Sequence, residues 1–187
     1  MFLDFVAAFD SVTRGNLWRI MVEDGMLVEF VELLKAYYEN CKSIVRVLGE
    51  ETEPFSVESG VKQGRILSHV LFNHCMYRLD SRKGTLSSFD GIVMGLGINE
   101  SDLDHADDID AFAADPATAQ AMLNELAHFS QLLGMNINTA KTKVMDLNAQ
   151  ADYQLILYRQ ELEKVDSFTY LGSVIDPRGG CEFTEKP

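Results

Sequence analysis

The sequence predicts an α+β domain in which an antiparallel sheet packs against helices on one of its faces. Short apolar segments with alternating polarity, typical of strands, are interspersed with segments whose apolar residues recur every three to four positions, as in helices. Of the 187 residues, 47% are hydrophobic and only 4 are proline, which suits a compact domain with a real core. The order strand, helices, hairpin, helix, hairpin, helix and strands fits the α+β class best.

The first part of the chain predicts one strand and a broken helix. Residues 2–7 form a short apolar run interrupted by Asp4, and they predict a strand that ends near Ala7. Residues 16–40 keep a helical spacing of apolar side chains, with a break around Asp24 and Gly25.

The next part predicts a hairpin and a second helix. Residues 42–49 and 53–60 alternate like two strands joined across a Gly-Glu-Glu turn. Residues 67–82 return to helical spacing.

The second half predicts further strands around one long helix. Residues 91–115 predict strand pairs, and Asp115 with the following proline predicts a helix start that runs to Gly134. Residues 135–147 predict a strand, and residues 152–175 predict two or three more.

Charge is distributed unevenly along the chain. The formal net charge is −13, which by itself argues against a nucleic-acid partner. However, no Lys or Arg occurs between Gly84 and Ala140, and basic residues lie on both sides of this acidic centre. Such a pattern suits a metal-dependent site that acts on a polyanion, and it suits a soluble acidic protein without a ligand equally well.

The cellular compartment is predicted from three absences in the sequence. The N-terminal residues lack the basic region of a signal peptide, and no apolar stretch approaches the roughly 18 residues that span a bilayer. Cys41, Cys75 and Cys181 form no paired framework. We therefore expect an intracellular protein, nuclear or cytoplasmic, with reduced thiols and no membrane partner.

Residues 102–112 (DLDHADDIDAF) carry five aspartates in nine positions, and this density admits three interpretations. A calcium-binding EF-hand loop is excluded, because Asp107 stands where glycine is needed and Ala113 where a bidentate glutamate is needed. A solvated loop or edge strand remains open.

The third interpretation is a divalent-metal site. A tight hairpin would place Asp107 and Asp108 at its tip, and a distant acid would complete the site. Asp4 is the natural candidate, because a carboxylate inside an apolar strand costs several kcal/mol unless a cation pairs with it.

Five blocks of the chain resemble the reverse transcriptases of non-LTR (LINE-type) retrotransposons, in the family's order and spacing. FLDFVAAFDSV resembles motif A, SGVKQGRILSHVLFN motif B, and HADD the YADD of motif C. GMNINTAKTKVM resembles motif D, and FTYLGSVI resembles motif E. Together the blocks cover almost the whole chain.

The resemblance implies the polymerase palm fold, which is RRM/ferredoxin-like, and a catalytic centre with two Mg²⁺ (or Mn²⁺) ions. Asp4, Asp107 and Asp108 match its three metal-binding carboxylates. The implied reaction is RNA-directed addition of dNTPs to a DNA primer 3′-OH, which is phosphoryl transfer at two metals. RNA template, DNA primer and dNTP are the implied partners, and the oligomeric state is left open.

Further residues match family positions around the nucleotide and primer. Phe5 and Phe9 match residues beside the incoming nucleotide, where Phe9 would exclude a 2′-OH. Gln63 and Gly64 match the motif B pair that lies against the nascent base pair. Lys141 matches the motif D lysine that protonates pyrophosphate. Tyr170, Leu171 and Gly172 match the primer grip.

Each of these positions also has a structural interpretation: a core phenylalanine, a turn before a helix, a surface lysine or an amphipathic strand. Asp102, Asp104 and Asp110 match no catalytic position, and we expect them to be solvated or to support the metal ligands.

Three residues depart from the family pattern. His105 replaces an aromatic residue of motif C, Arg65 replaces a cysteine of motif B, and His69 replaces a proline. These departures favour the hypothesis that this is a decayed element copy.

We expect the palm to span residues 1–176, with residues 177–187 as a tail, and the family's fingers and thumb to be missing. The chain alone should then be weakly active or inactive. The alternatives are a degenerate, non-catalytic scaffold or binding module and, less well matched, a group II intron maturase.

Overall fold

The computed structural model describes residues 1–62, 64–79, 92–94, 98–100, 102–105, 108–146, 153–170, 173–176 and 181–183. Its central feature is a five-stranded sheet with strand order β13-β10-β1-β9-β8. The strands are β1 (Phe2–Leu3), β8 (Asp102–His105), β9 (Asp108–Ala111), β10 (Lys143–Val144) and β13 (Glu163–Lys164). Three of the four neighbouring pairs are antiparallel, and the edge pair β10–β13 is parallel. The predicted α+β class is confirmed, with this parallel edge as the one departure.

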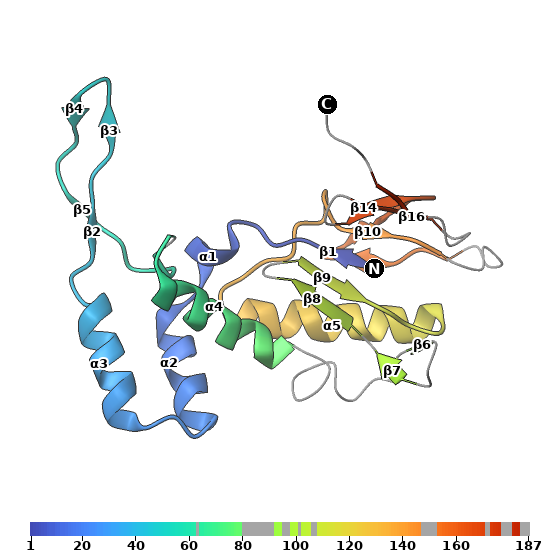
Figure 1. Ribbon diagram of the computed structural model, residues 1–187, viewed down its shortest axis with the longest axis horizontal. Coiled ribbons are helices and arrows are strands. Elements are labelled where there is room, and N and C mark those ends of the chain that lie inside the picture. The colour runs from blue at the N-terminus through green and yellow to red at the C-terminus, as the bar shows by residue number, and fades with distance from the viewer. Residues whose placement is uncertain are drawn as a thin grey trace.

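In the described part of the chain, five helices accompany the sheet: α1 (Ala8–Ser11), α2 (Arg14–Glu23), α3 (Val28–Tyr38), α4 (Ile66–Leu79) and α5 (Pro116–Leu132). In Figure 1, α5 runs along one side of β1, β8 and β9, while α2, α3 and α4 form a helical layer beyond its end. The two parts share one hydrophobic core, in which Leu3 and Ile109 of the sheet join Met122 and Leu126 of α5. Helix α5 begins as predicted, because the Asp115 carboxylate accepts hydrogen bonds from the Ala117 and Thr118 amides.

Three small sheets complete the described second half of the chain. They comprise β6 (Ile92–Met94) with β7 (Ile98–Glu100), β11 (Ile156–Leu157) with β12 (Gln160–Glu161), and β14 (Phe168–Tyr170) with β15 (Ser173–Ile175) and β16 (Cys181–Phe183). The ring of Phe168 stacks on that of Phe2, with centroids 3.8 Å apart. This contact joins the β14–β16 sheet to β1.

Two predicted strands are shorter than the sequence suggests. Strand β1 ends at Leu3, and the chain then makes only an isolated bridge between Phe5 and Ile137 before Ala7 turns it into α1 at a φ of 46°. Of this predicted strand, the described residues 135–146 contribute only β10, because Asn138 forms a turn in which its carbonyl accepts from the Thr142 amide at 2.8 Å. Local side-chain bonding by Asn competes with regular strand pairing.

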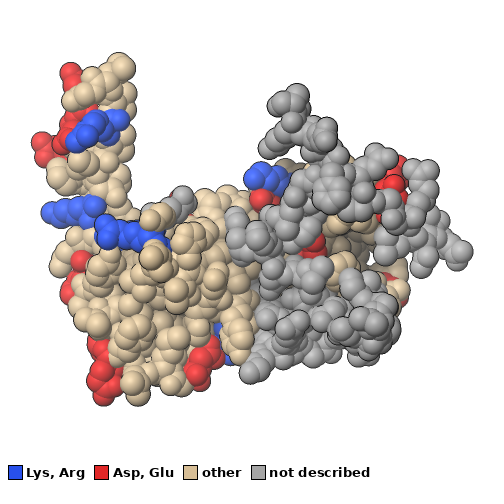
Figure 2. Space-filling model, in the orientation of Figure 1, with Lys and Arg blue, Asp and Glu red and all other residues tan. Residues whose placement is uncertain are grey.

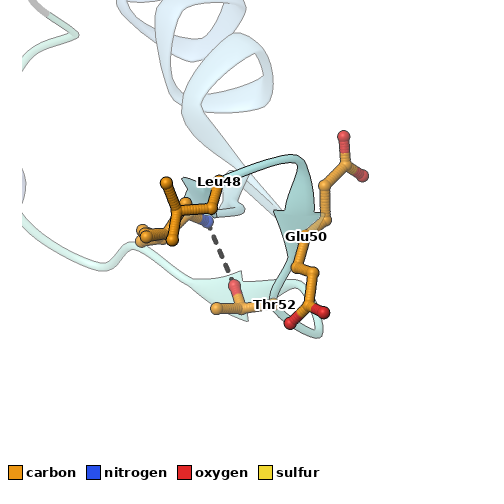
Figure 3. A pocket seen from close by; sticks show the side chains of 6 residues that line it. Leu48, Glu50 and Thr52 are labelled. Atoms are coloured by element: carbon orange, nitrogen blue, oxygen red, sulfur yellow. Dashed lines mark hydrogen bonds between the residues drawn. The ribbon is translucent and has the colours of Figure 1, made fainter.

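A long hairpin, residues 42–56, projects from the helical layer, and we call it the arm (Figure 1). It contains β2 (Lys42–Ser43), β3 (Arg46–Val47), β4 (Glu50–Glu51) and β5 (Phe55–Ser56). The predicted hairpin is confirmed, but its turn lies at Leu48 and Gly49, both at positive φ, as a two-residue hairpin turn requires. A hollow of about 370 Å³ lies near this tip, and the Val45 amide donates to Thr52 Oγ1 at 3.0 Å beside it (Figure 3).

Arg14 fixes the base of the arm. Its guanidinium donates hydrogen bonds to the carbonyls of Val57, Ser59 and Gly60 at 2.7–2.8 Å, and its carbon lies 4.9 Å from the Tyr38 ring centroid. The planar fork of arginine suits such a set of converging acceptors.

No helix of the described residues is long and apolar enough to cross a membrane. Cys41 and Cys75 are free and buried, and burial raises the pKa of the Cys75 thiol to about 12. This thiol is therefore unreactive at neutral pH.

A charged network links α4 to the end of α2. His74 Nε2 lies 3.0 Å from Asp24 Oδ2, and Arg78 contacts both Asp24 and Glu23. The His74 side chain is only 13% exposed. Burial lowers the pKa of His74, the nearby Asp24 partly opposes this shift, and Arg78 adds to it.

We expect this histidine to make stability depend on pH. The pKa of His74 is lower in the folded than in the unfolded state. Above the unfolded pKa near 6.5 the histidine is neutral in both states, so it does not make the free energy of unfolding depend on pH there. Stability is then lost as the pH falls below that value, since the unfolded state binds the proton more readily. Urea unfolding at pH 7.5 and 5.5 should show a smaller loss for His74→Gln than for the parent, and equal losses would contradict this role.

Candidate active site

Asp4 lies directly after β1, at the point where that strand leaves the sheet. Phe2 pairs with Asp110 and Leu3 with Ile109, so the same register brings the backbone of Asp4 level with that of Asp108. The pairing of Leu3 with Ile109 therefore holds the two acids next to these residues, 104 positions apart in the sequence, at the same end of the β1–β9 pair.

The Asp4 carboxylate is largely buried, and one of its oxygens lacks a hydrogen bond. Its side chain is 24% exposed, and Oδ2 accepts no hydrogen bond from any described residue. A buried carboxylate oxygen without a partner costs free energy, and a cation offsets that cost.

Lys141 is brought to Asp4 by the Asn138 turn. The Asn138 amide donates to the Asp4 carbonyl at 2.7 Å, which ties this turn to the end of β1. Asn138 Oδ1 accepts from the Ala140 and Lys141 amides at 3.2 and 3.4 Å. As a result, Lys141 Nζ lies 3.4 Å from Asp4 Oδ1 and 3.3 Å from Oδ2.

A pocket of about 410 Å³ opens at this point of the molecule. It is lined by Asp4, Phe5, Ala7, Ala8, Phe9, Gly64, His69 and Lys141. Five of these were singled out from the sequence, on segments up to 137 positions apart. The fold thus assembles them around one cavity.

The two aromatic residues of this group differ in burial. Phe5 is 4% exposed and belongs to the hydrophobic core, while Phe9 is partly exposed at the core's edge. The Phe9 ring stacks on Phe72 with centroids 4.2 Å apart and meets His69 edge-on at 5.4 Å. Phe9 is therefore a fixed wall of the pocket.

Gly64 closes another side of the pocket, at a φ of 79°. The preceding segment is held against α1, because the Val61 amide donates to the Phe9 carbonyl at 2.8 Å. His69, one turn into α4, was noted in the sequence only as a departure from the family pattern. Its place one helical turn beyond Gly64, a predicted site residue, was the signal that could have assigned it to the pocket.

Several predicted site residues cannot be placed in full. Gln63, Asp107, Leu171 and Gly172 lie outside the described residues. Asp108, Tyr170 and His105 are described by their backbone alone, and His105 pairs with Asp108 across the β8–β9 hairpin. Their side-chain roles stay predictions.

The structure excludes one of the two expectations for Asp110. Its side chain is 3% exposed on β9, the strand between β1 and β8, so it is not solvated, and a supporting role beside the metal ligands stays a prediction. Asp102 and Asp104 belong to β8, and their side chains lie outside the described residues.

The described residues supply one part of a divalent-cation site at Asp4, a carboxylate, but not a complete set of ligands. They contain no group of three His, Cys, Asp or Glu side chains that could hold a metal ion. Asp4 nevertheless offers a carboxylate oxygen, of the kind that Mg²⁺ prefers, which accepts no hydrogen bond and has only the ammonium of Lys141 as a counter-ion at 3.3 Å.

The sequence is similar to known reverse transcriptases and products of mobile elements. Residues 1–175 match the family model described as reverse transcriptase (RNA-dependent DNA polymerase). The chain is 30% identical over 181 residues to the Pol polyprotein of a type-2 retrotransposable element of Drosophila melanogaster, covering 91% of this chain and 17% of that protein.

Two further relatives are also products of mobile elements. The chain is 29% identical to the Pol polyprotein of a type-1 retrotransposable element of Popillia japonica, covering 97% of this chain and 27% of that protein. A putative transposon-derived protein of Caenorhabditis elegans is 39% identical over 85 residues, which cover 43% of this chain and 30% of that protein. The chain thus spans less than a third of each of these relatives, and it belongs to the reverse transcriptase family, in its non-LTR (LINE-type) retrotransposon branch.

Proposed function

We propose that this chain is the palm of an RNA-directed DNA polymerase that adds dNTPs to a primer 3′-OH by two-metal phosphoryl transfer. The observation that carries the proposal is the pocket at Asp4, where a carboxylate oxygen without a hydrogen bond lies beside residues of motifs A, B and D. The family supports this chemistry, and the strand register adds Asp108 to the same edge.

Asp4, Asp107 and Asp108 would hold two Mg²⁺ or Mn²⁺ ions. When bound, such ions lower the pKa of the attacking hydroxyl and neutralise charge on the leaving pyrophosphate. Phe9 would limit the space for the sugar of the incoming nucleotide, since its ring is held in place by Phe72. Lys141 Nζ, already at the pocket, would donate a proton to the pyrophosphate.

RNA template, DNA primer and dNTP would be the partners within the full-length enzyme, in the nucleus or cytoplasm. From this chain alone we expect little activity. It covers at most 30% of the relatives it matches, and His105, Arg65 and His69 depart from the family pattern.

One observation favours a non-catalytic scaffold as a second candidate. The ammonium of Lys141 lies 3.3 Å from Asp4 Oδ2, so the carboxylate has a counter-ion within the protein itself. A palm that had lost metal binding would keep Asp4 for this ion pair alone.

Metal binding separates the two candidates. If 1 mM Mn²⁺ is about ten times its dissociation constant, binding stabilises the fold by about 1.4 kcal/mol and raises Tm by about 3–5 °C. We expect this shift to disappear in Asp4→Asn and to persist in Asp166→Asn, which removes an exposed aspartate elsewhere.

Primer extension on an RNA template completes the test. We expect extension close to background for the parent chain, with any metal-dependent signal lost in Asp4→Asn. No thermal shift with Mn²⁺ in the parent, or equal shifts in both variants, would favour the scaffold. Robust extension by the parent that Asp107→Ala abolishes would refute the expected weak activity.

A further inference from the structure

Tyr37, near the end of α3, is contacted by two basic side chains from the segment before α4. Tyr37 is 43% exposed, and Arg65 Nη1 donates a hydrogen bond to its hydroxyl at 2.8 Å. Lys62 Nζ lies 5.6 Å from the centroid of the same ring. We call Tyr37, Lys62 and Arg65 the Tyr37 patch.

The two cations of the patch have no acidic partner among the described residues. Some other exposed cations do have one: Lys35 pairs with Glu32, and Arg46 pairs with Glu51. This contrast matters because the chain holds 29 acids and only 16 Lys and Arg. Two like charges held at one ring repel each other, and an anion that accepts hydrogen bonds from both relieves that repulsion.

The composition of the patch indicates which anion fits. Arginine and lysine bind phosphate oxygens, and an exposed tyrosine ring offers a face on which a base stacks. Cations interleaved with aromatic rings are typical of surfaces that bind single-stranded nucleic acid. In Figure 2, Lys and Arg side chains gather at the base of the arm, while nearer its tip acidic and basic side chains lie together.

The patch adjoins the pocket at Asp4. Arg65 directly follows Gly64, which lines that pocket. Its carbonyl accepts from the amide of His69, another residue of the pocket wall, at 3.5 Å. A polynucleotide that leaves the pocket past Gly64 would therefore reach Arg65 next.

We propose that the Tyr37 patch binds the phosphodiester backbone of a single-stranded polynucleotide at the mouth of the pocket. The inference rests on the proposed function for the nature of the polymer. The patch is an open surface, so it fits a continuous strand better than an enclosed triphosphate. Arg65, which departs from the family's cysteine, is on this view a gained contact and not a sign of decay.

The test is RNA binding in EDTA, where no metal or nucleotide takes part. Fluorescence anisotropy of a labelled 20-nucleotide oligouridylate at 50 mM salt measures Kd. We expect Lys62→Gln and Arg65→Gln each to weaken binding by about 3–10-fold and to lower the slope of log K against log salt by about 0.7. Tyr37→Phe, which keeps the ring and removes the acceptor of Arg65, should weaken binding by about 2–3-fold.

Arg159→Gln is the matched control, because it removes an exposed cation at the β11–β12 turn. We expect less than a twofold effect from it, and a Tm near that of the parent for every variant. A second arm adds dATP or inorganic triphosphate as competitor, and neither should displace the RNA at micromolar concentration.

Three outcomes would overturn the inference: no RNA binding by the parent, equal effects of Arg159→Gln and Arg65→Gln, or displacement by micromolar triphosphate. The two proposals also fail separately. If Mn²⁺ does not raise Tm but the patch variants still weaken RNA binding, only the metal site is refuted. If Mn²⁺ raises Tm but the patch variants leave RNA binding unchanged, only the patch is refuted.

Discussion

Gly134→Ala is expected to lower the free energy of unfolding by about 2–5 kcal/mol. Gly134 ends α5 with a φ of 85°, a conformation that costs other residues about 1–2 kcal/mol. A Cβ there would also lie 2.2 Å from Thr13 Oγ1 and 2.7 Å from the Ser11 carbonyl oxygen. The backbone carbonyl cannot rotate aside, so the α1–α2 link must move, which adds about 1–3 kcal/mol.

Gly25→Ala provides a matched control for this prediction. Gly25 has a nearly identical φ of 87°, and a Cβ there would meet nothing within 4 Å. Only the conformational cost of about 1–2 kcal/mol should remain. Urea unfolding of both variants measures the difference, and equal losses would show that the close approach at Thr13 is relieved without cost.

Phe72→Ala should cost about 3–5 kcal/mol, the usual range for a buried phenylalanine. Phe72 is 0% exposed and stacks on Phe9, so its loss leaves a cavity directly behind the pocket wall. A destabilisation on this scale is a large part of the roughly 5–15 kcal/mol that holds a domain folded.

The control for Phe72 is Phe55→Ala on the arm, where the side chain is 47% exposed. Its effect should stay within about 0.5 kcal/mol. Chemical unfolding again gives the comparison. If Phe72→Ala and Phe55→Ala were equally mild, the Phe9–Phe72 stack could not be what fixes the pocket wall.

The elements best predicted from the sequence are those with strong local signals. Helix α5 has an Asp115 cap at its start and Gly134 after its end, and both act as expected. The β8–β9 hairpin follows from alternation, and its register pairs His105 with Asp108.

What the sequence alone could not supply is long-range contact. No local pattern reports that Lys141 reaches Asp4, or that Phe168 stacks on Phe2. These contacts depend on how the strands are ordered in the sheet, and strand order is a property of the whole chain. For the same reason, the sequence left open whether Asp110 is solvated, and the structure shows it buried on β9.

The hydrogen bonds of Arg14 couple movement of the arm to the rest of the domain. The Arg14 guanidinium binds three carbonyls at the returning end of the arm, and the next residue, Val61, is bonded to the carbonyl of Phe9. The base of the arm therefore cannot act as a hinge that absorbs motion. A load applied at the tip near Leu48 would be transmitted through this joint to Phe9, a residue of the pocket wall more than 30 positions away in the sequence.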